Sequence, residues 1–211
     1  MEQGNGKSTE RRRVVQRNGI IFPQGEVCRV PAIIEEGLVR LCDYLPDGQR
    51  VVLGFAFPGE LIGMDVYSPT VTTEAATSVL LRAWPGGNAG FETAEARALT
   101  DALRRLNASV AVRARRQLEA RVAAFLVNLV DRDNDSVWDL PVSRSDLADH
   151  LVLSVHTVSR VISTLQRFGI VARARGKKLT ILDLDQLRNV AGEGMPPPRD
   201  AVFALQSEMS H

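Results

Sequence analysis

Hydrogen-bonding and cationic side chains recur along one face of the segment 154–169. At helical spacing this face carries five of them and no acid: His156, Ser159, Arg160, Ser163 and Arg167. An arginine on a helix can donate two parallel hydrogen bonds to guanine in the major groove of DNA, and serine or histidine can contact bases or phosphates. A solvated helix face is the ordinary alternative, but the neighbouring elements favour a nucleic-acid-binding helix.

The elements around this face have the layout of a winged helix-turn-helix. Ser143 and Asp146 form a capping box, which predicts a short helix through Leu151. Ser154 is placed to cap a second helix that ends at Gly169. Two short strands, IVARA and KKLTIL, follow as a hairpin. The inward face of the second helix is expected to hold four apolar residues: Val155, Val158, Ile162 and Leu165.

The charge of the chain is unevenly distributed. The whole chain has 26 basic and 25 acidic residues, a net charge of +1. Residues 141–181 alone contain seven basic side chains and two acids, Asp146 and Asp149, whereas the remainder carries a net charge of −4. The positive segment coincides with the predicted DNA-binding helices, which supports binding to a polyanion.

No proline or glycine occurs between residues 94 and 130, which predicts a long helix followed by a connecting helix with a second apolar stretch over 122–130. The apolar residues of the long helix form a narrow stripe at spacings of four, three and four: Leu99, Leu103, Leu106 and Val110. A stripe this narrow favours packing against the same helix of a second subunit. The alternative is a surface helix packed on its own β domain.

The segment from Val14 to Trp84 is predicted to form an antiparallel β domain. Runs rich in Val, Ile, Leu and Phe, such as AIIEEGLVRL and QRVVLGFAF, are separated by glycine and proline turns at strand-length intervals. Between these two runs, Pro46-Asp47-Gly48 predicts a tight turn, because proline presets φ, aspartate can bond its own backbone and glycine accepts a positive φ. The predicted architecture is therefore α+β, with a flexible tail over 1–13, an antiparallel sandwich or barrel over 14–91, helices over 92–130, a winged helix-turn-helix over 131–190 and a second tail over 191–211.

Composition excludes several classes of protein. The chain of 211 residues is 45% hydrophobic, which argues against a mostly disordered protein. No apolar stretch is long enough to span a membrane and no secretory signal is present, so we expect a cytoplasmic protein. Two cysteines, Cys28 and Cys42, cannot build a disulfide framework or a four-ligand zinc site. The first histidine is His150, and neither a nucleophile elbow nor a phosphate-binding glycine loop occurs, so we expect no enzyme.

The sequence over residues 14–190 resembles the CRP/FNR superfamily of bacterial transcription regulators, in particular its FNR/FixK branch. The resemblance rests on EEGLVRLCDYLPDGQRVVLGFAFPGELIGMD in the β half, and on ARVAAFLVNL and LPVSRSDLADHLVLSVHTVSRVISTLQRFGIV in the C-terminal half. It implies a β-roll sensor like a cyclic-nucleotide-binding jelly roll, a dimerisation helix and a winged helix-turn-helix. It also implies a homodimer that binds palindromic double-stranded promoter DNA and recruits RNA polymerase.

The resemblance implies DNA-contacting roles for individual residues. Base contacts are expected from Arg160 to guanine and from Ser159 and His156, where the family usually has Glu in place of His156. Part of a TTGAT-like half-site is therefore expected, with a changed preference at one base. Phosphate contacts by resemblance are Ser143, Arg144, Ser145, Ser154, Thr157 and Lys177; charge alone adds Arg175 and Lys178. Val152 stands where the family often has glycine, which predicts an altered turn.

No effector is expected from the β-roll. The two cysteines exclude a four-thiolate iron–sulfur cluster within one chain. The stretch SPTVTTEAATSV lacks the arginine that holds a cyclic phosphate and contains Glu74, which argues against cAMP. All histidines lie outside the β domain, which argues against haem. Regulation through protein abundance is the default; the alternatives are a cyclic-nucleotide-responsive regulator, a redox-thiol-responsive regulator and a module that binds protein rather than DNA.

Overall fold

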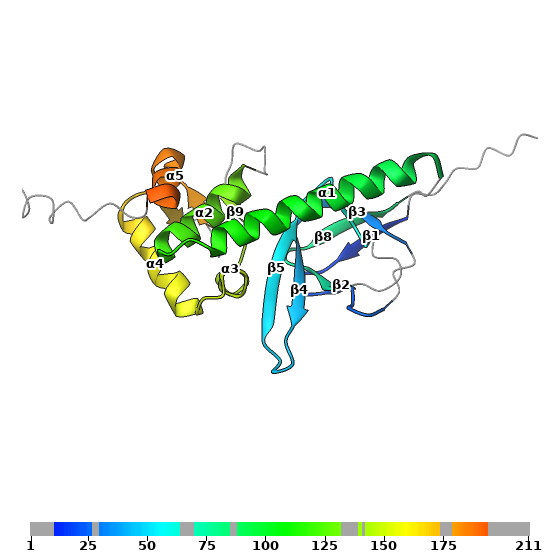
Figure 1. Ribbon diagram of the computed structural model, residues 1–211, viewed down its shortest axis with the longest axis horizontal. Helices are drawn as coiled ribbons and strands as arrows, with labels where there is room; N and C mark the ends of the chain where they lie inside the picture. Colours follow the sequence, from blue (N-terminus) through cyan, green and yellow to red (C-terminus); the bar gives the residue numbers. More distant parts are fainter. Residues whose placement is uncertain are drawn as a thin grey trace, which may run out of the picture. The chain divides into compact units, whose positions relative to one another are not determined.

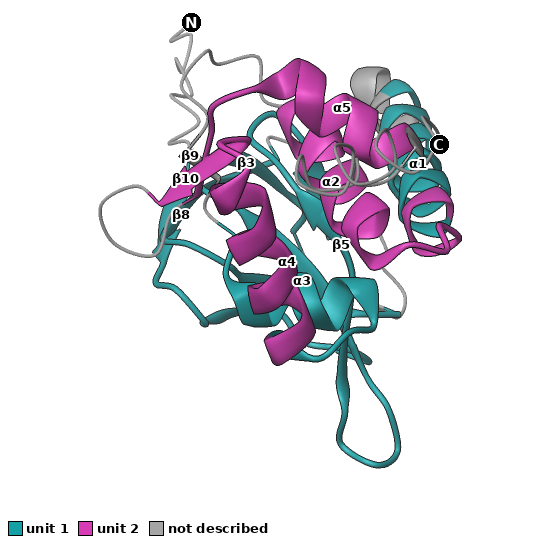
Figure 2. Ribbon diagram, turned by 90° about the vertical axis from the view of Figure 1, so that its left-hand side faces the viewer, with its two compact units in different colours: residues 1–110, 141–155 teal, residues 111–140, 156–211 magenta. Residues whose placement is uncertain are grey.

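A computed structural model describes residues 11–26, 30–63, 70–84, 88–131, 139–140, 142–173 and 179–193 (Figure 1). The predictions made for the tail before residue 11, for Cys28, for Arg175, Lys177 and Lys178 and for the chain after residue 193 lie outside these ranges. Two compact units are distinguished: residues 1–110 with 141–155, and residues 111–140 with 156–211 (Figure 2). Residues 141–155, which we assigned to the DNA-binding domain, thus belong to the unit that contains the β domain.

The first unit contains two four-stranded antiparallel sheets, as expected for a β-roll. The first sheet has the order β1 (Arg12–Val15), β8 (Val79–Ala83), β3 (Ala32–Glu36) and β6 (Leu61–Ile62). The second has the order β2 (Ile20–Phe22), β7 (Thr72–Ala75), β4 (Val39–Tyr44) and β5 (Arg50–Ala56). Most neighbours in the sheets are far apart in the chain, which is the topology of a roll rather than of a simple meander.

The core of the β-roll follows from alternation along the strands. In β3, Ala32 and Ile34 are buried whereas Ile33 is only half-buried. Val39 and Val79 are completely buried and belong to the same apolar cluster as Ile34. Burial of these side chains from both sheets stabilises the roll.

The turn between β4 and β5 confirms the interpretation of Pro46-Asp47-Gly48. The Asp47 carboxylate accepts a hydrogen bond of 2.9 Å from the backbone N–H of Gln49. Gly48 has a φ of 84°, a conformation that glycine adopts without steric cost. The turn therefore sets the antiparallel pairing in which Tyr44 lies opposite Arg50.

The predicted N-terminal tail extends too far. Arg12 and Arg13, which we placed in the tail over 1–13, are the first residues of β1 and pair with Arg82 and Leu81 of β8. Arg12 also forms an ion pair with Glu35 at 2.9 Å. Pairing with an existing sheet edge orders this polar segment although it has no apolar run of its own.

The predicted long helix is α1 (Asn88–Arg113). Its side chains Arg105 and Ser109 face the β-roll, where Arg105 pairs with Glu60 and the Ser109 hydroxyl donates to the carbonyl of Leu53 at 3.1 Å. Its predicted apolar stripe remains 57–61% exposed: Leu99, Leu103, Leu106 and Val110. The structure therefore leaves this stripe available for another surface, and the dimer stays a prediction.

The first helix of the predicted helix-turn-helix is α3 (Arg144–Leu151), and it packs on β5 within the first unit. Leu147, Ala148 and Leu151 are buried. The helix thus combines a core-facing apolar side with an N-terminus that holds the predicted phosphate contacts.

The second unit contains α2 (Leu118–Val130), α4 (Val155–Arg167), α5 (Leu184–Glu193) and a three-stranded sheet. The sheet has the order β10 (Val171–Arg173), β11 (Leu179–Ile181) and β9 (Asp139–Leu140), all antiparallel. The apolar α2 packs on α5, which buries Leu187 and Val190. None of the described helices combines the length and apolar character needed to cross a membrane.

Candidate nucleic-acid interface

The α4 helix separates an apolar side from a polar side, largely as predicted. Val158, Ile162 and Leu165 are at most 3% exposed. Val161, which we did not assign to the core, is also buried, so the apolar stripe has the wider i, i+3, i+4, i+7 pattern. The prediction for Val155 is wrong, since its side chain is 47% exposed. Side chains of a helix tilt toward its N-terminus, so the side chain of the first residue points away from the rest of the helix and its buried face.

The polar side of α4 presents the predicted base-contacting residues. His156 and Arg160 are exposed, and Ser159 is half-buried. The hydroxyl of Ser163 instead donates to the backbone carbonyl of Ser159 at 2.9 Å, which occupies this donor within the helix. Arg167 lies over the ring of Phe168 at the helix end, 5.7 Å from its centroid.

Predicted phosphate contacts gather at the N-terminus of α3. The Ser143 hydroxyl accepts a hydrogen bond of 3.0 Å from the backbone N–H of Asp146 and donates to its carboxylate at 2.6 Å, which confirms the N-cap. Arg144 is half-buried and Ser145 is exposed. The positive end of a helix and these polar side chains suit an anion such as a DNA phosphate.

The turn after α3 keeps a left-handed residue despite the absence of glycine. Val152 has φ 55° and ψ 51°, and the N–H of Leu153 bonds the carbonyl of Ala148 at 3.0 Å. The expected altered turn is therefore wrong at this position: a β-branched residue occupies the left-handed region, at a conformational cost. Ser154 and Thr157, two further predicted phosphate contacts, follow at the start of α4, exposed and half-buried respectively.

A buried ionic network joins α3 to the second sheet, and sequence reasoning missed it. Arg40 of β4 is its centre, with a side chain only 5% exposed. The guanidinium donates to Glu74 of β7 at 2.8 Å and to Asp146 of α3 at 3.0 Å. It also donates to the side-chain oxygen of Asn18 at 3.1 Å. Because each buried charge has an opposite partner and hydrogen bonds, the network satisfies the main requirement for burying ions.

A second arginine extends this network to the outer side of α3. Arg50 of β5 lies 2.9 Å from Asp146 and donates to Asp149 through Nε at 2.9 Å. Burial lowers the pKa of Arg50, but the hydrogen bond with Asp149 and the charges of the two aspartates outweigh burial and raise its pKa above the usual value. Asp149 and Arg50 are 27% and 21% exposed, so this half of the network borders solvent.

Two further contacts hold the C-terminal end of α3 on β5. The Nδ1 atom of His150 lies 2.9 Å from the backbone carbonyl of Val52, and since a carbonyl only accepts, this nitrogen carries the hydrogen. The ring of His150 also lies against that of Phe55, with centroids 5.6 Å apart and tilted by 57°. His150 is 3% exposed and thus acts as part of the packing between α3 and the sheet.

A hydrogen bond adds Tyr44 to the edge of the network. Its hydroxyl donates to Glu74, and this bond, followed by burial and the charge of Glu74, raises the pKa of Tyr44 to about 12. Nearby, Cys42 is completely buried, and burial followed by the charge of Glu74 raises the pKa of its thiol to about 12. Cys42 is therefore protonated and unreactive at neutral pH.

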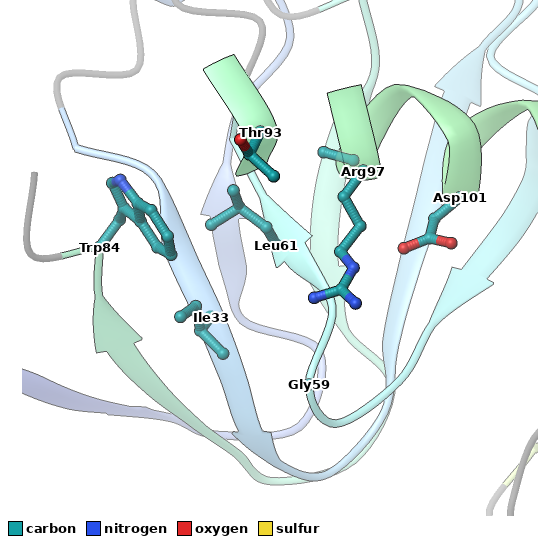
Figure 3. Close-up of a pocket in the computed structure, with 8 residues that line it drawn as sticks. Ile33, Gly59, Leu61, Trp84, Thr93, Arg97 and Asp101 are labelled. Atoms are coloured by element: carbon teal, nitrogen blue, oxygen red, sulfur yellow. The ribbon is translucent and has the colours of Figure 1, made fainter. Parts of the chain in front are cut away.

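A cavity of about 480 Å³ lies between α1 and the first sheet (Figure 3). Ile33 and Leu61 line it from the strands, and Trp84 contributes its ring, while Arg97 and Asp101 extend from α1. An anionic ligand would meet the Asp101 carboxylate beside the Arg97 cation, so this lining does not resemble a phosphate site. In the described part of the chain, no three His, Cys, Asp or Glu side chains are grouped as metal ligands would be.

Comparisons with known families match both halves of the chain. Residues 12–88 match the cyclic nucleotide-binding domain family, and residues 120–190 match the Crp-like helix-turn-helix domain family. These ranges contain the two sheets of the β-roll and the α3, α4 and hairpin elements, respectively.

Individual proteins resemble the chain over most of its length. The nitrogen fixation regulation protein FixK of Rhizobium meliloti is 32% identical over 81% of this chain and 82% of its own. The transcriptional regulator LdrP of Thermus thermophilus is 31% identical over 85% of this chain and 96% of its own. Among solved structures, a CRP-family transcriptional regulator from Thermus thermophilus is 30% identical, with a TM-score of 0.74, and the match covers 87% of this chain and 98% of that one. FixK2 from Bradyrhizobium japonicum, at 24% identity, has the same fold with a TM-score of 0.76, over 88% of this chain and 99% of that one.

Proposed function

This chain belongs to the CRP/FNR family of transcription regulators with a helix-turn-helix DNA-binding domain, and we propose that it binds palindromic promoter DNA as a homodimer. In this proposal each subunit reads one half-site through α4, and the bound dimer recruits RNA polymerase in the cytoplasm. The proteins it resembles are regulators of transcription rather than enzymes.

The observation that carries this proposal is the division of α4 into two sides. Val158, Ile162 and Leu165 anchor the helix through one side, which leaves His156 and Arg160 directed to solvent on the other. A helix anchored in this way can enter the major groove without losing its own core. In the proposal, Arg160 donates to guanine, and Ser159 and His156 contact bases or the adjacent phosphates.

The proposed dimer uses the exposed stripe of α1. Leu99, Leu103, Leu106 and Val110 are each more than half exposed, and four apolar side chains in one line are costly to leave in water. A second copy of the same helix covers such a stripe by symmetric packing. Two subunits also match the two halves of a palindrome.

Sedimentation velocity tests the dimer. We expect the wild-type chain to sediment as a dimer, and Leu103→Lys/Leu106→Lys to sediment as a monomer that still folds, because both side chains are exposed in the single chain. Arg104→Lys, on a 72% exposed side chain of the same helix, is the matched control and should remain dimeric. A double lysine variant that remains dimeric would contradict the proposed dimer interface along the stripe of α1.

We propose that no effector controls DNA binding and that the amount of protein does. Two carboxylates that could contact a ligand in the roll already have cationic partners: Glu60 pairs with Arg105, and Glu74 pairs with Arg40. Glu74 stands in the stretch where cAMP receptors of the family hold the phosphate, and this stretch contains no arginine that could bind an anionic ligand. These features support the absence of a cyclic nucleotide; the cysteine count and the position of the histidines argue against an iron–sulfur cluster and haem.

Two alternatives receive less support. A redox-thiol regulator needs a reactive thiolate, whereas the pKa of Cys42 is raised to about 12 by its burial. A module that binds protein through its helix-turn-helix would be expected to expose apolar anchors on α4. Apart from Val155 at its first position, the exposed side of that helix instead carries histidine, serine and arginine.

A further inference from the structure

The acids of the predicted DNA-binding segment are neutralised from outside that segment. Between residues 141 and 181 the chain has two acids, Asp146 and Asp149. Both lie on α3, and both are paired with arginines of the second sheet of the β-roll. The cationic partners of both aspartates therefore come from strands that lie about a hundred positions earlier in the sequence, where Arg40 and Arg50 also pair with Glu74.

We propose that Arg50 is a positioning residue for DNA binding, which holds α3 on the sheet and cancels the charge of Asp149 beside the phosphate contacts. This inference rests on the proposed function, since it concerns the same DNA interface. It assigns to the β-roll a part in DNA affinity that does not depend on any effector.

The geometry at the N-terminus of α3 supports the proposal that the sheet holds this helix in one orientation. One oxygen of the Asp146 carboxylate accepts from the Ser143 hydroxyl, and the other accepts from Arg40 and Arg50. The carboxylate that accepts from the N-cap hydroxyl is thus the same one that the sheet holds. Rotation of α3 about its axis would break the bonds that Asp146 accepts from Arg40 and Arg50, so the sheet fixes the direction in which Ser145 and its neighbours face solvent.

The electrostatic role that we propose for Arg50 follows from the position of Asp149. This residue lies in the same short helix as the predicted phosphate contacts Arg144 and Ser145, and 27% of its side chain is exposed. A bare carboxylate so close to a DNA backbone would repel the phosphates through a partly solvated medium. Arg50 donates to Asp149 through Nε and a terminal guanidinium nitrogen, so the pair presents no net charge to the DNA.

Arg50 is a better target for mutation than Arg40. The Arg40 side chain is 5% exposed and has two buried acids as partners, so its loss endangers the fold. Arg50 is 21% exposed, and Asp146 keeps its ion pair with Arg40 when Arg50 is replaced. Arg82 provides the matched control: it is 23% exposed and pairs with Glu35 on the other sheet, so Arg82→Gln removes the same charge without touching α3.

The experiment measures DNA affinity by fluorescence anisotropy on a duplex that the wild-type chain enriches from a random pool. We expect Arg50→Gln to bind about tenfold more weakly, and Arg82→Gln within about twofold of the wild type, because only the first leaves an unpaired acid near the phosphates. The double variant Arg50→Gln/Asp149→Asn should recover to within about threefold, since it removes that acid. A purely structural role would give a lower melting temperature and no such recovery.

Each outcome decides a separate question. Equal affinities of Arg50→Gln and Arg82→Gln, or a double variant as weak as Arg50→Gln, would overturn the role of Arg50 and leave the proposed function standing. Failure of the wild-type chain to bind any duplex would overturn the proposed function and this inference with it. If Arg50→Gln does not fold, Asp149→Asn alone decides: affinity equal to or above the wild type supports the inference, and a lower affinity overturns it.

Discussion

The helices α3 and α4 use their polar residues in opposite ways. In α3 the polar residues Asp146 and His150 are buried at 1% and 3% exposure, and both bond to the β-roll. In α4 the polar residues His156 and Arg160 are exposed, while its apolar side chains form the buried face. Asp146 and His150 of α3 thus hold the helix in place, whereas His156 and Arg160 of α4 are directed to solvent and available to a ligand.

This comparison separates stability from binding. Mutations on the buried side of α3 should change the free energy of unfolding, and mutations on the exposed side of α4 should change DNA affinity alone. The predictions below test that separation, from the largest expected effect to the smallest.

Replacement of the buried carboxylate of α3 should have the largest effect. Asp146→Ala leaves Arg40 with one acid fewer in a buried site and removes the partner of the N-cap, so we expect the free energy of unfolding to fall by about 3–5 kcal/mol. Urea denaturation measures this loss. Asp149→Ala on the same helix is the control: its side chain is 27% exposed, and we expect a loss of about 1 kcal/mol or less.

Replacement of the exposed arginine of α4 should change binding and leave stability alone. We expect Arg160→Ala to weaken binding to the enriched duplex by about 1–3 kcal/mol and to relax the preference for guanine, with less than about 0.5 kcal/mol change in unfolding. Arg188→Ala, on an exposed arginine of α5 paired with Asp131, controls for the loss of one positive charge. Equal weakening by Arg160→Ala on a random duplex would show that Arg160 contacts phosphate and not a base.

The residue that ends α3 should report the conformational cost of its left-handed backbone. Val152→Gly relieves a β-branched residue at φ 55°, and we expect a gain of about 1 kcal/mol in the free energy of unfolding. Val152→Asn should give a smaller gain, since asparagine tolerates this region better than valine. A loss of stability in the glycine variant would mean that packing of the valine side chain outweighs its backbone strain.

A lysine of the predicted hairpin should give the smallest effect. Lys177→Ala removes one expected phosphate contact, so the slope of log affinity against log salt should fall by about 1 for specific and random DNA alike. Anisotropy titrations at several salt concentrations measure this slope. An unchanged slope would remove Lys177 from the phosphate contacts.

Local patterns in the sequence predicted local structure well. Ser143 and Asp146 identified the start of α3, and the turn at Asp47-Gly48 identified the β4–β5 hairpin. The apolar spacing in α4 predicted three of its four buried residues. These features depend on residues within one or two turns of each other, which sequence spacing records directly.

Long-range pairing lay beyond the sequence patterns. Arg40 and Asp146 are 106 positions apart, and no periodicity links a strand residue to a helix of a different predicted domain. The one available signal was that Asp146 and Asp149 are acids in a segment otherwise rich in basic residues, which indicates that each needs a cationic partner. Arg12 and Arg13 likewise form a strand because they pair with β8 at the edge of the sheet. Their own polar sequence does not predict this pairing.

Selection of bound DNA from a random pool tests the central claim most directly, namely that the exposed side of α4 reads DNA. The account predicts that the wild-type chain enriches a palindrome whose half-sites retain part of a TTGAT-like sequence, with one position altered by His156. It also predicts that Arg160→Ala loses the guanine from the enriched half-site. Enrichment of no sequence by the wild-type chain, or of the same palindrome by the wild type and Arg160→Ala, would contradict it.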